Sequence, residues 1–96
     1  MAIMVAGDSM APKYPHGTRV FIKRIDDSLF INWGEVYVLD TTNGVIIKKV
    51  APSDKPDCLR CVSLNPAPEY APFDVPKKEV RALYRVLVSM TQEAAG

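Results

Sequence analysis

The sequence predicts a mostly β fold, a small twisted or partly closed antiparallel sheet. Three observations predict it. Apolar residues alternate with polar ones along most of the chain, proline- and glycine-rich stretches separate these segments, and no segment has an apolar stripe of helical period over three turns. The chain has 96 residues, of which 48% are hydrophobic. That is enough for one thin core, so we expect a single domain over residues 1–96.

The first expected strand covers residues 18–25. Val20 and Ile22 share one face of it, and the residues between them point to the other face. The second and third strands, residues 35–40 and 45–50, are separated by Asn43-Gly44, the strongest short signal for a tight hairpin. We therefore expect these two strands to pair antiparallel.

A fourth strand is expected at residues 58–64, and the last and longest at residues 80–89. In the last strand the even-numbered residues share one apolar face: Val80, Ala82, Tyr84, Val86 and Val88. All eight prolines lie between the expected strands. Residues 65–78 are expected to form a long, proline-stiffened connection, and residues 91–96 a frayed tail.

Charge and hydropathy exclude several classes of function. The formal net charge of +1 gives the chain no basic surplus that would attract nucleic acid. No apolar run reaches the roughly 20 residues that a membrane span needs. Residues 1–6 lack the basic start and the apolar stretch of a secretory signal. We therefore expect a cytoplasmic protein that makes no membrane contact.

The two cysteines, Cys58 and Cys61, have the spacing of a C-x-x-C pair. A zinc site would need two more ligands at suitable spacing, and His16 is the only histidine. On a strand, an odd separation places the two thiols on opposite faces. We therefore interpret both as small apolar strand residues and expect no metal and no cofactor.

Ser9 lies in the turn-like segment Gly7-Asp8-Ser9-Met10-Ala11-Pro12. A serine in such a turn is by itself more typical of a turn or a cap than of catalysis. A nucleophilic serine also needs a base that takes its proton. His16 follows in a second turn, but nothing in the sequence singles out a carboxylate that would complete a triad with it.

A lysine is the other possible base, and it acts as one only when burial keeps it neutral. Lys48 and Lys49 lie in the apolar strand VIIKKV, at residues 45–50. They point to opposite faces, and each has two aliphatic residues on its own face. The pattern leaves open which of them is buried. It also fits an edge strand from which both lysines reach water.

Taken in order, six segments resemble the peptidase domain of LexA-type and lambda-like phage repressors and of UmuD. They are GDSMAP at 7–12, YPHG at 14–17, GEVYVLD at 34–40, IIKKV at 46–50, SLNP at 63–66 and VRALYRVLV at 80–88. Each motif alone is modest, but the ordered set covers almost the whole chain. The resemblance implies a β fold of the LexA and signal-peptidase type.

The resemblance also implies the chemistry of a serine endopeptidase. Ser9 is then the nucleophile, and Lys48, the first lysine of the pair, is its general base. The backbone N–H groups of Ser9 and Met10 are the expected oxyanion donors. Domains of this kind cleave their own chain in a linker that follows a DNA-binding domain. We expect both to be absent here, because only eight residues precede Ser9. Ala6-Gly7 resembles the scissile pair of the family but lies too close to Ser9 to fold back onto it.

The expected function is therefore that of the C-terminal domain of a transcriptional repressor, such as one that controls an SOS response. The partners implied are a second copy in a homodimer, the repressor's own upstream linker as substrate, and a RecA-like co-protease as a further candidate. DNA would be contacted only through the missing N-terminal domain. One alternative is a dimerisation and effector module with an idle dyad. Another is a type I signal peptidase, which would need a membrane anchor.

Overall fold

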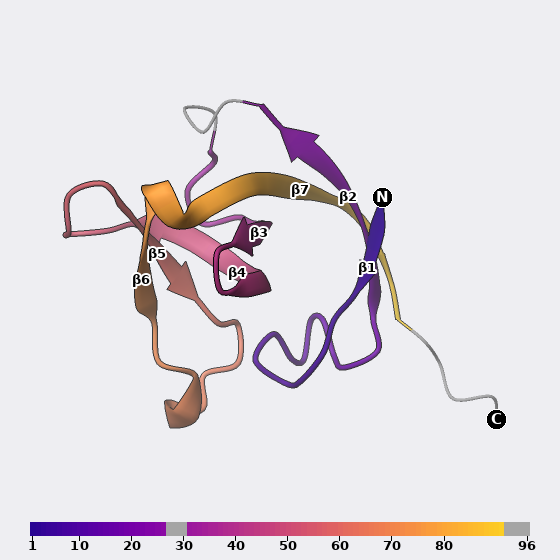
Figure 1. Ribbon diagram of the computed structural model, residues 1–96. Helices are drawn as coiled ribbons and strands as arrows, with labels where there is room; N and C mark the ends of the chain where they lie inside the picture. Colours follow the sequence, from indigo (N-terminus) through magenta and orange to yellow (C-terminus); the bar gives the residue numbers. More distant parts are fainter. Residues whose placement is uncertain (27–30, 92–96) are drawn as a thin grey trace, which may run out of the picture.

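The computed structural model describes residues 1–26 and 31–91. They form a seven-stranded antiparallel sheet that curls into a half-barrel (Figure 1). The strands are β1 (Ala2–Met4), β2 (Arg19–Ile25), β3 (Val36–Thr41), β4 (Gly44–Pro52), β5 (Cys58–Val62), β6 (Phe73–Pro76) and β7 (Val80–Met90). They lie in the order β1-β2-β7-β3-β4-β5-β6, with β1 and β2 at the right of Figure 1 and β5 and β6 at the left. The prediction of a mostly β, partly closed antiparallel sheet is confirmed.

The hairpin expected around Asn43-Gly44 is present between β3 and β4. Thr41 pairs with Gly44, so Thr42 and Asn43 form the loop. Gly44, the first residue of β4, takes the positive φ of +122° that glycine tolerates best. The Thr41 hydroxyl closes the turn by donating a hydrogen bond of 2.7 Å to the Gly44 carbonyl.

Two short strands were not predicted. β1 has only three residues, too few to show an alternating pattern. β6 lies within residues 65–78, which were wrongly expected to be a connection throughout; 3-10 turns at Pro68–Tyr70 and Lys77–Glu79 precede and follow it. Pro52 and Pro76 also contradict the prediction that all prolines lie outside strands. Each is the last residue of its strand, where a missing N–H costs little.

The face predicted for β7 is correct in its middle and wrong at both ends. In the pairing with β2, the register skips Leu87, and Val88 lies opposite the exposed Phe21 instead of facing the core. In the pairing with β3, it skips Arg81, and Val80 joins the opposite core cluster. An extra residue in one strand reverses the faces beyond it, and no sequence period reveals where it occurs.

Each face of the sheet carries a core cluster. The first is covered by the segment between β1 and β2 and consists of Val5, Met10, Tyr14, Val20, Ile22, Val38 and Ile47. Val20 and Ile22 therefore share one face of β2, as predicted, and the structure shows that this face packs into the core. The second cluster lies on the other face: Ile31, Tyr37, Leu39, Val50, Leu59, Cys61 and Leu83. β3 and the middle of β4 are thus buried on both faces.

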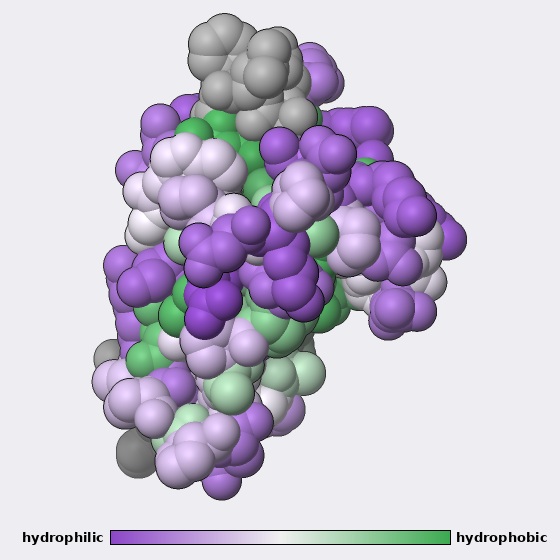
Figure 2. Space-filling view, turned by 90° about the vertical axis from the view of Figure 1, so that its left-hand side faces the viewer, coloured by the Kyte–Doolittle hydropathy of each residue, from purple (hydrophilic) through white to green (hydrophobic). Residues whose placement is uncertain are grey.

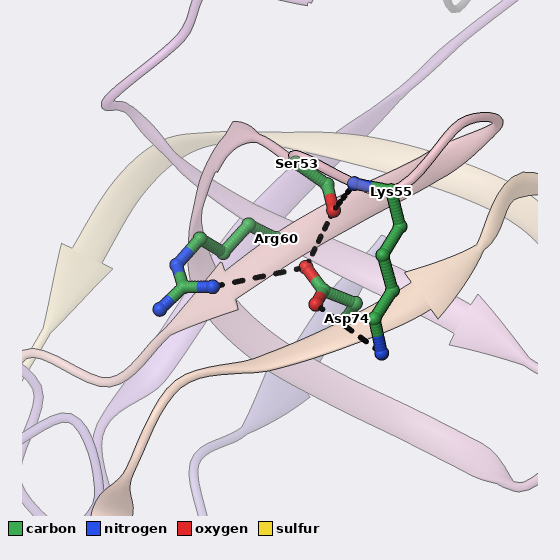
Figure 3. Close-up of polar contacts among 4 residues, drawn as sticks. All are labelled: Ser53, Lys55, Arg60 and Asp74. Carbon is green, nitrogen blue, oxygen red and sulfur yellow. Dashed lines mark hydrogen bonds and ion pairs between the residues drawn. The ribbon is translucent and has the colours of Figure 1, made fainter.

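A polar network around Asp74 ties the edge strand β6 to its neighbours (Figure 3). The Ser53 hydroxyl donates a hydrogen bond of 2.7 Å to Asp74 Oδ1, and Ser53 Oγ accepts one from the Lys55 N–H. The Lys55 and Arg60 side chains lie 3.9 and 4.0 Å from the Asp74 carboxylate. Ion pairs this long and this exposed contribute little, so the Ser53 hydrogen bond is the main polar tie between the β4–β5 connection and β6.

The side of the molecule that carries β5 and β6 is mostly hydrophilic. Figure 2 shows hydrophobic atoms on it mainly in recesses between polar side chains. The helices described in residues 1–26 and 31–91 are all too short to cross a membrane. The frayed tail expected at the C-terminus lies, from residue 92 onward, outside the described residues.

Candidate active site

Ser9 lies in a tight turn that follows β1 and packs over the first core cluster. The segment is closed at its base by two hydrogen bonds, Val5 N–H to Thr18 O at 2.8 Å and Gly17 N–H to Val5 O at 2.9 Å. Gly7 has a φ of +82°, a conformation that residues with a Cβ rarely adopt. The requirement for glycine two residues before Ser9 is therefore conformational.

Lys48 of β4 reaches Ser9 from a position 39 residues further along the chain. Its Nζ lies 2.7 Å from Ser9 Oγ and donates a hydrogen bond to it. Only 9% of Lys48 is exposed. The pair proposed from the sequence is thus brought into direct contact, with the spacing that transfer of a proton between hydroxyl and amine requires.

The surroundings of Lys48 favour its neutral form. Burial lowers the pKa of Lys48 below its usual 10.5, because an apolar environment disfavours the ammonium ion. A thiolate at Cys61 would act in the opposite direction. Burial, however, also raises the pKa of Cys61 to about 11, so the thiol stays protonated near neutral pH. Lys48 therefore has a neutral thiol as its neighbour, and burial is the dominant influence on its pKa.

The pairing of the strands explains this environment. Lys48 lies opposite the buried Tyr37 in the β3–β4 ladder, and Val50, two residues further along the same face, lies opposite Cys61. Lys49 points to the other face, where it lies opposite Val36 and is half-buried. The structure thus separates the two lysines that the sequence pattern left equivalent.

His16 does not contact Ser9 through a hydrogen bond. Its Nδ1 instead accepts a hydrogen bond of 2.9 Å from the Gly7 N–H. The imidazole thereby holds the start of the turn that carries Ser9. This contact was not predicted, because nine residues separate the two partners and only the folded turn brings them together.

A cleft of about 330 Å³ opens beside the Ser9–Lys48 pair. One wall is formed by β1 and the residues that follow it, and the other by the first half of β4. Its lining is apolar apart from the two polar residues: Ile3, Met4, Val5, Ala6, Ser9, Val45, Ile46, Ile47 and Lys48. An apolar wall with two convergent polar groups is typical of a site that orients a bound molecule.

Both walls present a strand edge without a strand partner in the described residues. β1 pairs only with β2, and β4 pairs with β5 only from Lys49 onward. The edge of residues 45–48 therefore faces the cleft. Unpaired N–H and C=O groups along such edges can bind a further extended segment.

The N–H groups of Ser9 and Met10 donate no hydrogen bond to another residue of the ranges 1–26 and 31–91. The carbonyls of the same turn are occupied. Ser9 O accepts a bond from the Asn65 N–H, and Asp8 O accepts bonds from the Asn65 side chain and the Ala11 N–H. The turn thus has two N–H donors next to the Ser9 hydroxyl that are unpaired within the part of the chain that the structure describes.

Cys58 and Cys61 are both free thiols. They face opposite sides of β5, as predicted, with Cys61 buried and Cys58 half-buried. Within the described ranges, no three His, Cys, Asp or Glu side chains gather closely enough to hold a metal ion.

Comparison with known proteins places these residues in a family. A family model described as Peptidase S24-like matches residues 1–87. The matched range contains Ser9, Lys48 and all seven strands except the last residues of β7. No curated protein and no solved structure matches the chain.

Proposed function

We propose, from the premise that this chain belongs to the Peptidase S24-like family, that it is a latent Ser-Lys autopeptidase. It would be the C-terminal domain of a LexA-like or phage-type repressor and would cleave that repressor's own linker. The observation that carries the proposal is the 2.7 Å hydrogen bond between Lys48 Nζ and Ser9 Oγ. A lysine whose pKa is lowered by burial and whose amine contacts a serine hydroxyl is the arrangement that a lysine general base requires.

In the proposed reaction Ser9 Oγ attacks the carbonyl carbon of the scissile peptide while neutral Lys48 Nζ takes the hydroxyl proton. The N–H groups of Ser9 and Met10 stabilise the oxyanion of the tetrahedral intermediate. The Lys48 ammonium then protonates the leaving amine, which departs and leaves an ester on Ser9. Water attacks this ester, Lys48 takes the water's proton and returns it to Ser9, and the acid product leaves.

The proposed substrate is an extended peptide segment that lies in the cleft between β1 and β4. The free strand edges would bind its backbone, and the aliphatic walls would take its apolar side chains. In this proposal the protein acts in the cytoplasm and reaches DNA through a separate N-terminal domain. A RecA-like co-protease is a further partner consistent with it.

The test is cleavage at alkaline pH. The full-length parent, or this domain mixed with a peptide from the parent's linker, is incubated from pH 7 to pH 10 and analysed by mass spectrometry. We expect one cut, faster as pH rises because a larger fraction of Lys48 is then neutral. The Ser9→Ala variant, which keeps the fold, should give no cut.

If the folded wild-type protein gives no cut at any pH, the peptidase proposal is wrong. The alternative of a non-cleaving dimerisation and effector module with an idle dyad would then stand. A cut that persists in Ser9→Ala would instead point to a contaminating protease.

Dimerisation is the second function that an observation favours. The outer face of β1, β2 and β7 exposes four large apolar side chains: Met4, Phe21, Val88 and Met90. The pairings place Phe21 opposite Val88, and Arg19 opposite both Met4 and Met90, so these side chains share one face. An apolar surface of this kind on a small protein favours self-association, and we propose a two-fold homodimer through it.

Val88→Glu is expected to weaken this dimer at least tenfold, because each copy would bury a charge in the interface. Sedimentation velocity over a concentration series measures the effect. Phe73→Glu is the matched control, since Phe73 is similarly exposed but lies on β6. A wild-type protein that stays monomeric throughout the series would contradict the proposed homodimer.

A further inference from the structure

Asn65 makes two hydrogen bonds to the turn that carries Ser9, although they are distant in sequence. Its side-chain Nδ2 donates to the Asp8 carbonyl at 2.9 Å, across 57 residues. Its backbone N–H donates to the Ser9 carbonyl, also at 2.9 Å. One residue therefore holds two successive carbonyl groups of the turn.

The two hydrogen bonds from Asn65 also determine where the neighbouring N–H groups point, because of the geometry of the peptide bond. A trans peptide is planar, and its N–H points opposite to its C=O. Because Asn65 holds the Asp8 carbonyl, the Ser9 N–H of the same peptide points away from Asn65. The Ser9 carbonyl likewise directs the Met10 N–H. Neither of these two N–H groups donates to a partner in the described residues.

Asn65 is itself held in place. Its Oδ1 accepts a hydrogen bond of 3.0 Å from the Ala67 N–H. This bond fixes which end of the amide is the acceptor, and so presents Nδ2 to Asp8. An amide locked in this way loses little further freedom when it holds the turn.

We propose that Asn65 is a positioning residue of the peptidase site. It holds the Asp8 and Ser9 carbonyls and thereby keeps the Ser9 and Met10 N–H groups directed at the place where the oxyanion forms. This inference rests on the proposed function, and it assigns the orientation of the oxyanion hole to a side chain outside the Ser9–Lys48 pair. Preorganised donors of this kind lower the barrier because they need no rearrangement during the reaction.

Asn65→Asp and Asn65→Ala test the proposal. Both remove the Nδ2 donor and keep the backbone bond to Ser9, and Asp also keeps an oxygen for the Ala67 N–H. Ser63→Ala is the control, because Ser63 lies in the same segment and its side chain bonds to no other described residue. The probe is p-nitrophenyl acetate. Transfer of its acetyl group to Ser9 is measured from the nitrophenol released and from the mass of the acetylated protein.

We expect kcat for acetyl transfer to fall about 10- to 100-fold in both Asn65 variants, with KM within twofold. This is less than the roughly 100- to 1,000-fold loss seen when an oxyanion donor is removed outright, because here the donors stay and only lose their alignment. The pH at which the rate is half-maximal should not move, since Lys48 is untouched. Folded Asn65 variants that keep the wild-type kcat would overturn the proposal.

The two proposals fail in different ways. If wild-type Ser9 takes up no acetyl group at any pH, the peptidase function is wrong. The positioning role of Asn65 is then tested by comparing crystal structures of the wild type and Asn65→Ala. A rotated Asp8–Ser9 peptide in the variant supports the positioning role, whereas an unchanged peptide overturns it.

Discussion

Replacing Lys48 with methionine is expected to abolish cleavage and at the same time to stabilise the fold. Methionine fills nearly the same space as the lysine stem but has no amine that could take the Ser9 proton. Removing one member of a catalytic group typically lowers kcat by about 10⁴-fold or more. We expect a loss of that size at every pH from 7 to 10.

The gain in stability follows from the same burial that makes Lys48 a base. Its pKa is lowered in the folded protein, so the unfolded chain holds the proton more tightly. The free energy of unfolding is therefore reduced by a constant amount at pH values below the folded-state pKa of Lys48. This reduction becomes smaller as pH rises towards 10.5, the pKa in the unfolded chain, and disappears above it. Lys48→Met removes this reduction. We expect the free energy of unfolding at pH 7 to rise by about 0.5–2 kcal/mol, the usual range for a stabilising substitution.

Urea unfolding of both proteins at pH 7, 9 and 10.5 measures this gain. The advantage of Lys48→Met should be largest at pH 7 and should vanish near pH 10.5. Cys61 acts in the other direction in the wild type: its pKa rises from 9.0 to about 11 on folding, so stability falls as pH rises through that interval. Because the Lys48 charge itself lowers the pKa of Cys61, the comparison at pH 7, where the thiol is protonated in both proteins, isolates Lys48.

Lys49→Met is the matched control, because Lys49 is the next residue of β4 and lies on the face of the strand opposite to that of Lys48. It should keep the cleavage rate within about twofold. If Lys48→Met cleaved as fast as the wild type, Lys48 would not be the base. A variant that unfolded more easily at pH 7 would show that the Lys48 ammonium is stabilised rather than strained.

The sequence was sufficient to predict the sheet and five of its strands, because alternation reports burial directly. It could not predict the two register shifts in β7, where one extra residue reverses the faces without changing the composition. Alternation also left Lys48 and Lys49 equivalent, and only the family resemblance distinguished them. The structure gives the physical difference, since Lys48 shares its face with Tyr37 and Cys61.

Asn65 shows why the remainder of the site was not predicted. An asparagine before a proline is a common turn residue, and its sequence carries no sign of a partner 57 positions away. The contact depends on where β5 ends. Because β5 stops at Val62, the chain is free to turn towards Ser9, and the edge of β4 at residues 45–48 stays open. The early end of β5 thus allows Asn65 to reach the turn that carries Ser9, and it also leaves the β4 edge of the cleft unpaired.

Met10→Ala is expected to damage both the stability of the protein and the site. Met10 is fully buried in the first core cluster and adjoins Ser9 in the same turn. Truncating a buried methionine costs about 2–5 kcal/mol, since the apolar contacts are lost and a cavity remains. A domain of this size has a total stability of only about 5–15 kcal/mol. Urea unfolding should therefore show a large fall in the denaturation midpoint.

The same substitution should lower kcat even at temperatures where the variant is fully folded. Met10 anchors the peptide that carries one of the proposed oxyanion donors, and without its side chain that peptide keeps the hydrogen bond from the Asn65 N–H to the Ser9 carbonyl. Met10→Leu separates packing from chemistry, because it keeps the volume and should cost less than about 1.5 kcal/mol. If Met10→Ala lost less than about 1 kcal/mol, or kept the wild-type kcat, the core would not be what positions the turn. The orientation of Ser9 would then depend on its hydrogen bonds with Asn65 and Lys48 and on the bond that the Gly7 N–H donates to His16.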